Sequence, residues 1–459
     1  MKKQNNIFAY AKQTFSLILV ILFCTACSDE TYQDEKQVEE GIPVEVDFQF
    51  NTSEMQKVNT RLSDAGEFQV NDLYLLIFDS NGSIKNRYYY DGDALTHTNG
   101  NQQNPTNGTI TGIKTTSGKS YIYGIANVAD NELDRKGELK SKLDRISSVS
   151  DLKELTTILN NDGNIARSSA SLLMSGKFQA TSASASDKEE GICNIPTTNK
   201  ALSGTLLLRR SDSHITFNIN LGEKIESFEF KSWQVFNVPT SSYLIDQSKQ
   251  YVASEYKDSE LQATYNNEGK LYAFNFYMQE NLKEAIMKAS DNTTLTAYKD
   301  REKEYKNPDG TNTGKYKFVE ENATYVEIKA RMNIKTESED GIRTADVRYI
   351  IHLGGGTNDF TNFKSERNKK YIYNVTINDV ESIIVEVEDG EDDPNARPGV
   401  EGDVVDATTS IYTLDAHYNC FNIGFTYEDV VENLSFIIQS PFAADAVYSL
   451  SLIHISEPT

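Results

Sequence analysis

The sequence predicts an all-β protein made of antiparallel β-sandwiches. Apolar and polar residues alternate with a period of two along many short runs, which is the pattern of half-buried strands. Gly, Asn, Asp and Ser residues bound these runs, as expected for turns between antiparallel strands. Aromatic residues make up 10% of the 459 residues, with 25 Tyr and 21 Phe, so the chain can fill more than one hydrophobic core.

Acidic residues outnumber basic residues in this chain. Asp and Glu total 68, Lys and Arg total 45, and the formal net charge is −23. A surface of this sign repels the phosphate backbone of DNA and RNA. We therefore expect no nucleic-acid partner.

Residues 1–26 are predicted to be a lipoprotein signal peptide. Three lysines and no acidic residue precede the apolar run Phe15–Phe23, which is too short to span a bilayer. The run leads to Cys24-Thr25-Ala26-Cys27, and small residues just before a cysteine resemble the lipobox of bacterial lipoproteins, although Cys24 stands where Leu is usual. The resemblance implies that Cys27 carries the acyl anchor, palmitate included. An ordinary secretory signal is the alternative interpretation.

An acidic segment follows, and we interpret residues 27–43 as a tether. Ser28-Asp29-Glu30 comes directly after the expected anchor, and Thr31–Gly41 continues with few apolar side chains. Such a run is usually a solvated linker. It also resembles the acidic export signal of lipoproteins on the outer face of the outer membrane in Bacteroidota-type bacteria, which implies a cell-surface location.

The first β-sandwich is predicted over residues 44–210. Val44–Phe50 alternates perfectly. Val70–Asp79 meets Asn81-Gly82, a strong signal for a type I′ hairpin turn, and Ser83–Tyr90 returns as the second strand. A helical insertion is expected at about 134–159, a segment rich in Lys, Glu, Leu and Arg. The further strands expected here are Thr109–Ile113, Ser120–Val128, Ser171–Phe178 and the first part of Thr205–Leu221.

A second β-sandwich is predicted over residues 211–385, with polar loops between its strands. Residues 386–402, which follow it, are acidic and contain prolines, so we expect a linker there. The clearest strands of the second sandwich are Phe228–Asn237, Leu271–Met278, Ala323–Ile334, Thr344–Leu353 and Lys370–Ile377.

A third β domain is expected to begin at residues 403–449, where Ile411–Phe425 and Leu434–Ile438 have strand patterns. The last ten residues, 450–459 (LSLIHISEPT), resemble the translation of a transposon adapter used in sequencing libraries. We therefore expect the natural reading frame to be cut near Ser449, which truncates the third domain. Residues 450–459 are left out of the fold prediction for this reason.

No residue pattern predicts catalysis, a cofactor or a metal site. The five histidines lie in separate elements without paired ligand spacing, at positions 97, 214, 352, 417 and 454. Gly354-Gly355-Gly356 lacks the Lys and the Ser or Thr of a phosphate-binding loop, and the chain has no G-x-S-x-G motif. Sugar hydrolysis by paired carboxylates is left open by so acidic a chain, but nothing singles out a pair. We expect a protein that is not an enzyme.

Several motifs resemble the fimbrillins, the pilus subunits of Bacteroidota-type bacteria. Val70–Asp79 with Asn81-Gly82 is similar to their first hairpin. The segment from Glu381 to Tyr418 resembles a longer subclass of the family, whose C-terminal domain has no assigned function. The motifs between these two occur in fimbrillin order and are Met174-Ser175-Gly176, Leu206–Arg209 leading to Ile215, Trp233–Pro239, Tyr243-Leu244-Ile245 and the segment from Asn358 to Thr376.

This resemblance implies two transthyretin-like β-sandwiches in tandem that assemble outside the cell by donor-strand exchange. An arginine-specific protease would remove the anchored N-terminal segment, which holds one strand of the first sandwich, and a C-terminal strand of the next subunit would fill the vacated groove. Here Val44–Phe50 would be the removable strand, and Arg61, in the polar stretch Ser53–Gly66, would be the processing point.

The family also implies a role and a location. The chain would be a fimbrial subunit, or an accessory, tip or anchor component, that takes part in adhesion and has other fimbrial subunits as partners. It would lie at the outer membrane, held by the lipid on Cys27, or in the fimbrium. The residues leave a second class of function open, namely a monomeric surface lipoprotein that binds glycan or host protein through its sandwich loops.

Overall fold

The computed structural model describes residues 38–52, 68–98, 106–129, 131, 133–134, 137–159, 172–249, 251–263, 271–297, 300–309, 312–335, 342–355, 359–379, 382–388 and 395–398. Cys27, Arg61 and the expected third domain at 403–449 lie outside these residues, as do the expected signal peptide and residues 450–459. Within the described ranges, no helix has the length and apolar character needed to cross a membrane.

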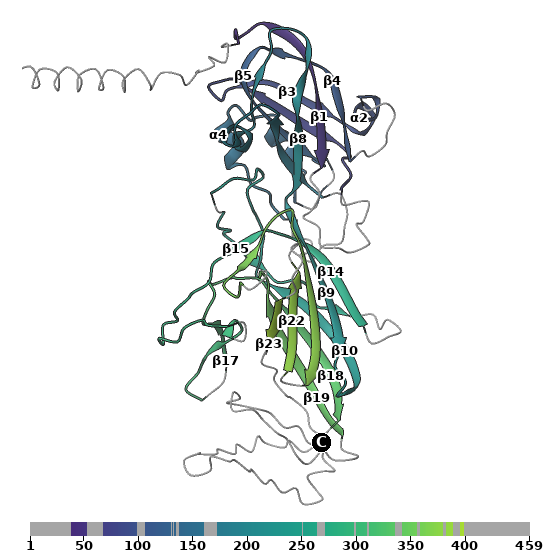
Figure 1. Cartoon of the computed structure of the whole chain (residues 1–459), viewed down its shortest axis with the longest axis vertical. Coiled ribbons are helices and arrows are strands. Elements are labelled where there is room, and N and C mark those ends of the chain that lie inside the picture. Colours follow the sequence, from purple (N-terminus) through teal and green to yellow (C-terminus); the bar gives the residue numbers. More distant parts are fainter. Residues whose placement is uncertain are drawn as a thin grey trace, which may run out of the picture.

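The described chain consists mainly of β-strands, in two domains that follow one another along the long axis of the molecule (Figure 1). The described helices are short, with at most seven residues. The predicted all-β fold class, with β domains in tandem, is confirmed.

The first domain is one eight-stranded sheet that curls around its own core. Its strands are β1 (Pro43–Thr52), β2 (Leu73–Phe78), β3 (Ile84–Tyr90), β4 (Asn107–Thr116), β5 (Gly118–Ala126), β6 (Met174–Ala180), β7 (Ile192–Ile195) and β8 (Lys200–Arg210). Their order across the sheet is β3-β2-β5-β6-β8-β1-β4, and β7 pairs with the first part of β5. Neighbouring strands are antiparallel except β1 and β8, which are parallel.

Strand β2 is apolar on both faces because both faces of the sheet are covered there. Its odd-numbered residues, such as Leu75, join the interior core of the first domain. Its even-numbered residues, such as Leu76, join a cluster with Leu139 and Leu152. These two leucines belong to helices α3 (Leu139–Leu143) and α4 (Val149–Glu154), which lie in the segment expected to be a helical insertion.

Two further short helices lie outside the segments predicted to be helical, namely α2 (Gly92–Thr98) and α5 (Ala185–Glu190). Helix α5 begins after Ser184, whose hydroxyl accepts a hydrogen bond from the Asp187 N–H, and it ends at Gly191 with φ of 73°. None of its residues is buried. The residues at its two ends therefore stabilise this helix, and apolar periodicity does not predict it.

The second domain is a sandwich of two sheets. Its sheet strands are β9 (Asp212–Leu221), β10 (Ile225–Phe236), β13 (Gln262–Ala263), β14 (Leu271–Gln279), β18 (Tyr325–Lys335), β19 (Ile342–His352), β21 (Lys370–Asp379), β22 (Ser382–Glu388) and β23 (Asn395–Pro398). One sheet has the order β13-β10-β18-β19, and the other has the order β14-β9-β21-β22-β23. Short antiparallel pairs are formed by β11 (Val238–Pro239) with β12 (Tyr256–Lys257), β15 (Asn281–Lys283) with β20 (Phe363–Ser365), and β16 (Glu304–Lys306) with β17 (Asn312–Tyr316).

Stacked aromatic rings fill the second sandwich. Trp233 is the one tryptophan in the sequence, and its ring lies 4.3 Å from that of Phe274. Phe217 stacks on Tyr373 at 4.6 Å. Because Trp233 is buried in this core, its fluorescence reports the folding of the second domain.

Part of segment 386–402, where a linker is expected, is strand in the structure. Strand β22 extends to Glu388, and β23 pairs with it antiparallel, with Val387 opposite Asn395 and Val385 opposite Arg397. The alternating pattern of β22 continues into the acidic stretch, so charge alone does not mark the end of the sheet.

The two domains meet without a linker, since Ser211 is the single residue between β8 and β9. Main-chain hydrogen bonds also join the domains, from the Thr157 N–H to the Ser242 carbonyl (2.9 Å) and from the Leu244 N–H to the Leu155 carbonyl (2.9 Å). The junction is thus built like a piece of β-sheet, which fixes the end of β8 relative to the second domain.

Candidate strand-exchange site

Strand β1 occupies an interior position of the first-domain sheet, between β8 and β4. It pairs parallel with β8 from Val46 to Thr52 and antiparallel with β4 from Pro43 to Asn51. We call the space between β8 and β4 that β1 fills the β1 groove. Both edges of any strand in this groove form main-chain hydrogen bonds.

The inward side chains of β1 are part of the first-domain core. Val44, Val46, Phe48 and Phe50 are at most 6% exposed and pack in the interior cluster with residues of every neighbouring strand. The Phe48 ring meets the Phe178 ring of β6 edge to face at 5.9 Å. The alternation predicted for Val44–Phe50 is therefore the alternation between core and surface.

The N-terminal end of β1 is held by Ser117, a fully buried residue between β4 and β5. Its N–H donates to the Ile42 carbonyl (2.8 Å), and its hydroxyl accepts from the Ile42 N–H (3.1 Å). The same hydroxyl donates to the Glu39 carbonyl (2.5 Å). At the other end, the Thr52 N–H donates to the Thr106 carbonyl (2.9 Å). These bonds tie residues 39–52 to the sheet at both ends.

Strand β4 does not depend on β1 alone for its position. The Tyr88 hydroxyl of β3 donates to the Lys114 carbonyl (2.5 Å), and the Lys85 ammonium donates to the Thr116 carbonyl (3.3 Å). Burial lowers the pKa of Lys85, an effect that the Glu40 carboxylate opposes. Because the two ends of the sheet are joined in this way, β4 keeps a second attachment when β1 is absent.

The chain that follows segment 53–67 is anchored separately from β1. The Arg210 guanidinium lies over the Phe68 ring at 4.2 Å. The Asn127 side chain accepts from the Asn71 N–H (2.8 Å) and donates to the Gln69 carbonyl (3.0 Å). A break in segment 53–67, which contains Arg61, would therefore leave residues 68–71 in place.

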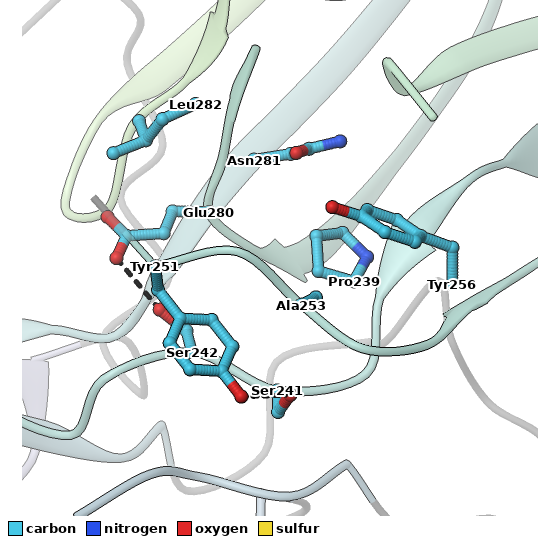
Figure 2. Close-up of a pocket in the computed structure, with 9 residues that line it drawn as sticks. All are labelled: Pro239, Ser241, Ser242, Tyr251, Ala253, Tyr256, Glu280, Asn281 and Leu282. Atoms are coloured by element: carbon cyan, nitrogen blue, oxygen red, sulfur yellow. Dashed lines mark hydrogen bonds between the residues drawn. The ribbon is translucent and has the colours of Figure 1, made fainter. Parts of the chain in front are cut away.

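The small cavity in Figure 2 lies beside strand β11 in the second domain. Its volume is about 10 Å³, room for one water molecule. The Ser242 hydroxyl donates to the Glu280 carboxylate (2.8 Å), and the Ser241 and Tyr251 hydroxyls lie 2.9 Å apart. The polar groups of its wall thus bind one another. The cavity is lined by Pro239, Ser241, Ser242, Tyr251, Ala253, Tyr256, Glu280, Asn281 and Leu282.

The described histidines do not come together. His214 stacks on Tyr277 at 4.4 Å in the second domain, and His352 pairs with the Glu302 carboxylate. In the part of the chain that the structure describes, no group of three or more His, Cys, Asp or Glu residues could hold a metal ion.

Three residues of the β1 groove were not anticipated from the sequence. Ser117 holds the N-terminal end of β1, Asn199 accepts from the Glu45 N–H (2.9 Å), and Gly112 donates its N–H to the Asp47 carboxylate (2.8 Å). Only Gly112 has a sequence signal, because a glycine inside a strand pattern suggests a bulge. The other two are polar residues whose partners are distant in sequence.

A family model described as "Major fimbrial subunit protein (FimA)" matches residues 43–315. A second model, described as a domain of unknown function (DUF4906), matches residues 276–375. No curated protein matches the sequence significantly.

Three solved structures are among those found to be similar to this chain. A candidate cell adhesion protein from Parabacteroides distasonis is 14% identical, with 79% of this chain and 97% of that chain covered and a TM-score of 0.45. The tip fimbrial protein Mfa3 from Porphyromonas gingivalis, in a C-terminally truncated form, is 12% identical, with 76% and 99% covered and a TM-score of 0.44. The fimbrial anchor protein Mfa2 from the same species is 10% identical, with 77% and 99% covered and a TM-score of 0.32.

Proposed function

Because this chain belongs to the family of the major fimbrial subunit protein FimA, whose model matches more than half of it, we propose that it is a cell-surface fimbrial component that assembles by exchanging β1 for a strand of another subunit. The role we assign is that of an accessory, tip or anchor component in adhesion. The resemblance of residues 381–418 to the longer fimbrillin subclass supports this role over that of a stalk subunit.

The observation that carries the proposal is the position of β1. It is an interior strand, yet it is the first strand of the described chain, so it can leave the sheet without unthreading any other element. Its four inward side chains contribute about 1.5–3 kcal/mol each when buried, or about 6–12 kcal/mol together. That sum is comparable to the whole stability of a typical domain, about 5–15 kcal/mol.

An empty β1 groove would therefore attract a replacement strand. The loss of β1 exposes apolar side chains of the core together with unpaired main-chain groups of β8 and β4. Strand edges with unpaired main-chain groups bind extended chains. Tyr88 and Lys85 attach β4 to β3, and this attachment supports the proposal that β4 stays in place and leaves the groove open for the incoming strand.

Cleavage after Arg61 would start this exchange. It separates β1 from the anchored segment 68–71, so that β1 is held by non-covalent contacts alone. To test this, Arg61→Ala and the parent chain would each be treated with an arginine-specific protease and analysed by native gel with a labelled peptide of residues 38–52. We expect the uncut parent to remain monomeric, the cut parent to take up the peptide, and Arg61→Ala to take up none.

A cut chain that keeps its own β1 and its thermal stability would contradict strand exchange and favour a monomeric surface lipoprotein. Uptake by Arg61→Ala equal to the parent would instead place the processing point at a different arginine.

The anchor is a separate part of the proposal. Cys27 would carry the lipid that holds the precursor in the outer membrane, and the acidic residues after it would direct the protein to the cell surface. We expect Cys27→Ala to move the protein from the membrane fraction to the soluble fraction and to abolish palmitate labelling. Cys24→Ala is the matched control and should leave both unchanged. Labelling lost in the control alone would move the anchor to Cys24.

A further inference from the structure

Strand β4 departs from regular pairing at the middle of β1. Val46 pairs with Ile113 and Phe48 pairs with Ile110, so two steps along β1 correspond to three steps along β4. The extra residue lies at Gly112, whose φ is 72°. A glycine in the left-handed region at such a position is typical of a β-bulge, which pins the register of the opposite strand.

Strand β8, on the other side of β1, is irregular at the same level. Asp47 pairs with Ala201 and Gln49 pairs with Thr205, so two steps along β1 correspond to four steps along β8. The irregular stretch contains Gly204, with φ of 150°. Because both neighbours carry extra residues opposite Asp47 and Phe48, a strand that slipped by two residues would lose regular pairing on both edges at once.

The bulge also presents a donor to the occupant of the groove. The Gly112 N–H donates to the Asp47 carboxylate at 2.8 Å, and a side chain without an acceptor would leave this N–H without that partner. The hydrogen bond from the Glu45 N–H to the Asn199 side chain discriminates less between partner strands, because every residue except proline has a main-chain N–H.

The inward positions hold side chains of different sizes. The first two hold Val44 and Val46, and the last two hold Phe48 and Phe50, all buried. The wall of the Phe48 position is the Phe178 ring. That ring packs against Gly204, where an added Cβ would lie 2.8 Å from the ring and 2.4 Å from the Gln179 carbonyl oxygen. The absence of a side chain at Gly204 thus leaves room for the Phe178 ring and for the Phe48 ring that packs on it.

We propose that the β1 groove selects a partner strand of one chemical class and one register. The strand carries small branched apolar residues at the positions of Val44 and Val46, an Asp or Asn at the position of Asp47, and aromatic residues at the positions of Phe48 and Phe50. This inference rests on the proposed strand exchange and specifies its partner. Strand β22, with the sequence SIIVEVE, contains no aromatic residue, so it does not meet the requirement.

The test uses the full chain with one specific protease site inserted at Arg61, cut and then incubated with a fluorescent peptide of residues 38–52. Urea is kept too dilute to change Trp233 fluorescence, so that the second domain stays folded while β1 exchanges. We expect Phe48→Ala and Phe50→Ala in the peptide to weaken binding at least 100-fold each, because each change empties a buried aromatic position. Asp47→Ala should weaken binding about 3–10-fold, as expected for one solvent-accessible hydrogen bond.

Matched peptides separate selectivity from general strand binding. The Gln49→Ala peptide changes an exposed position and should bind within 2-fold of the parent peptide. The Asp47→Asn peptide should also bind within 2-fold, because its amide oxygen can still accept the hydrogen bond from the Gly112 N–H. A peptide of residues 382–388 should bind at least 100-fold more weakly than a peptide of residues 44–50, which has the same length. Equal binding of the parent and Phe48→Ala peptides would overturn the selectivity but leave strand exchange intact. No binding of the parent peptide would overturn strand exchange itself.

Discussion

Phe48→Ala in the uncut chain should lower the free energy of unfolding of the first domain by about 3–5 kcal/mol. The side chain is 1% exposed and meets the Phe178 ring in a T-shaped pair, so its removal leaves a cavity beneath β1 and loses apolar burial. The effect should be local to the first domain. Hydrogen exchange of the β4 and β8 amides should accelerate, whereas the urea transition followed by Trp233 fluorescence should stay within about 0.5 kcal/mol of the parent.

Gln49→Ala is the matched control, because it lies next to Phe48 in the same strand but points to solvent. It should change stability by less than about 0.5 kcal/mol. Unchanged exchange of the β8 amides in Phe48→Ala would show that β1 is not held in the first-domain core, and the β1 groove would then lose its energetic basis.

The second large effect is expected at Arg367, a buried residue that holds the second-domain side of the junction. Its guanidinium donates to the Tyr243 carbonyl (2.7 Å), the Ser242 hydroxyl (3.0 Å) and the Glu280 carboxylate (2.5 Å). Burial acts to lower the pKa of Arg367, but the carboxylates of Glu280, Asp246 and Asp212 together outweigh burial and raise the pKa, so the side chain stays charged. Segment 242–244 in turn bonds to the first domain.

Arg367→Ala should therefore lower the free energy of unfolding by about 3–5 kcal/mol, because it leaves the Glu280 carboxylate, which is only 13% exposed, without its cationic partner. The urea transition of Trp233 fluorescence measures this loss. Glu280→Gln keeps a hydrogen-bond acceptor beside Arg367 and removes the opposite charge, and it gives a second readout if Arg367→Ala does not fold. It should also destabilise the second domain.

Arg209 provides a control of the same residue type at the same junction. It pairs with Asp246 at 3.1 Å, but its side chain is 50% exposed. Exposed ion pairs contribute about 0–1 kcal/mol, so Arg209→Ala should have a correspondingly small effect. A loss in Arg367→Ala no larger than that in Arg209→Ala would mean that the buried pair does not hold the junction.

The alternation of apolar and polar residues predicts a strand well where one face of the strand is buried and the other is exposed to solvent. Val44–Phe50 is the clearest case, since its alternation corresponds residue by residue to core and surface in β1. The hairpin of β2 and β3 also follows from the sequence, because Asn81-Gly82 lies between two strand patterns. The predicted type I′ turn is wrong, because Gly82 has positive φ (79°) and Asn81 does not. For β2 the alternation is hidden, because the α3 and α4 insertion covers its second face.

The features that define the candidate site depend on pairing between distant segments. Nothing in the alternation of β1 indicates that it lies parallel to β8, more than 150 residues away, or that it has neighbours on both edges. The bonds from Ser117 and Asn199 to β1 likewise join residues that the sequence separates widely. Arg367 at the junction gives no periodic signal at all. Such contacts follow from the topology, which periodicity does not specify.

The single-residue connection between β8 and β9 has a mechanical consequence. An uncut precursor anchored at its N-terminus would be pulled through the beginning of β1, while a load on the second domain would pull β8 from its C-terminal end, through Ser211. Parallel strands pulled from opposite ends slide along each other, so their hydrogen bonds share the force and must break together. Tension would then load the hydrogen bonds between β1 and β8 in shear, instead of breaking them one at a time. The same holds for a replacement strand that lies in the direction of β1 and is held at its N-terminal end.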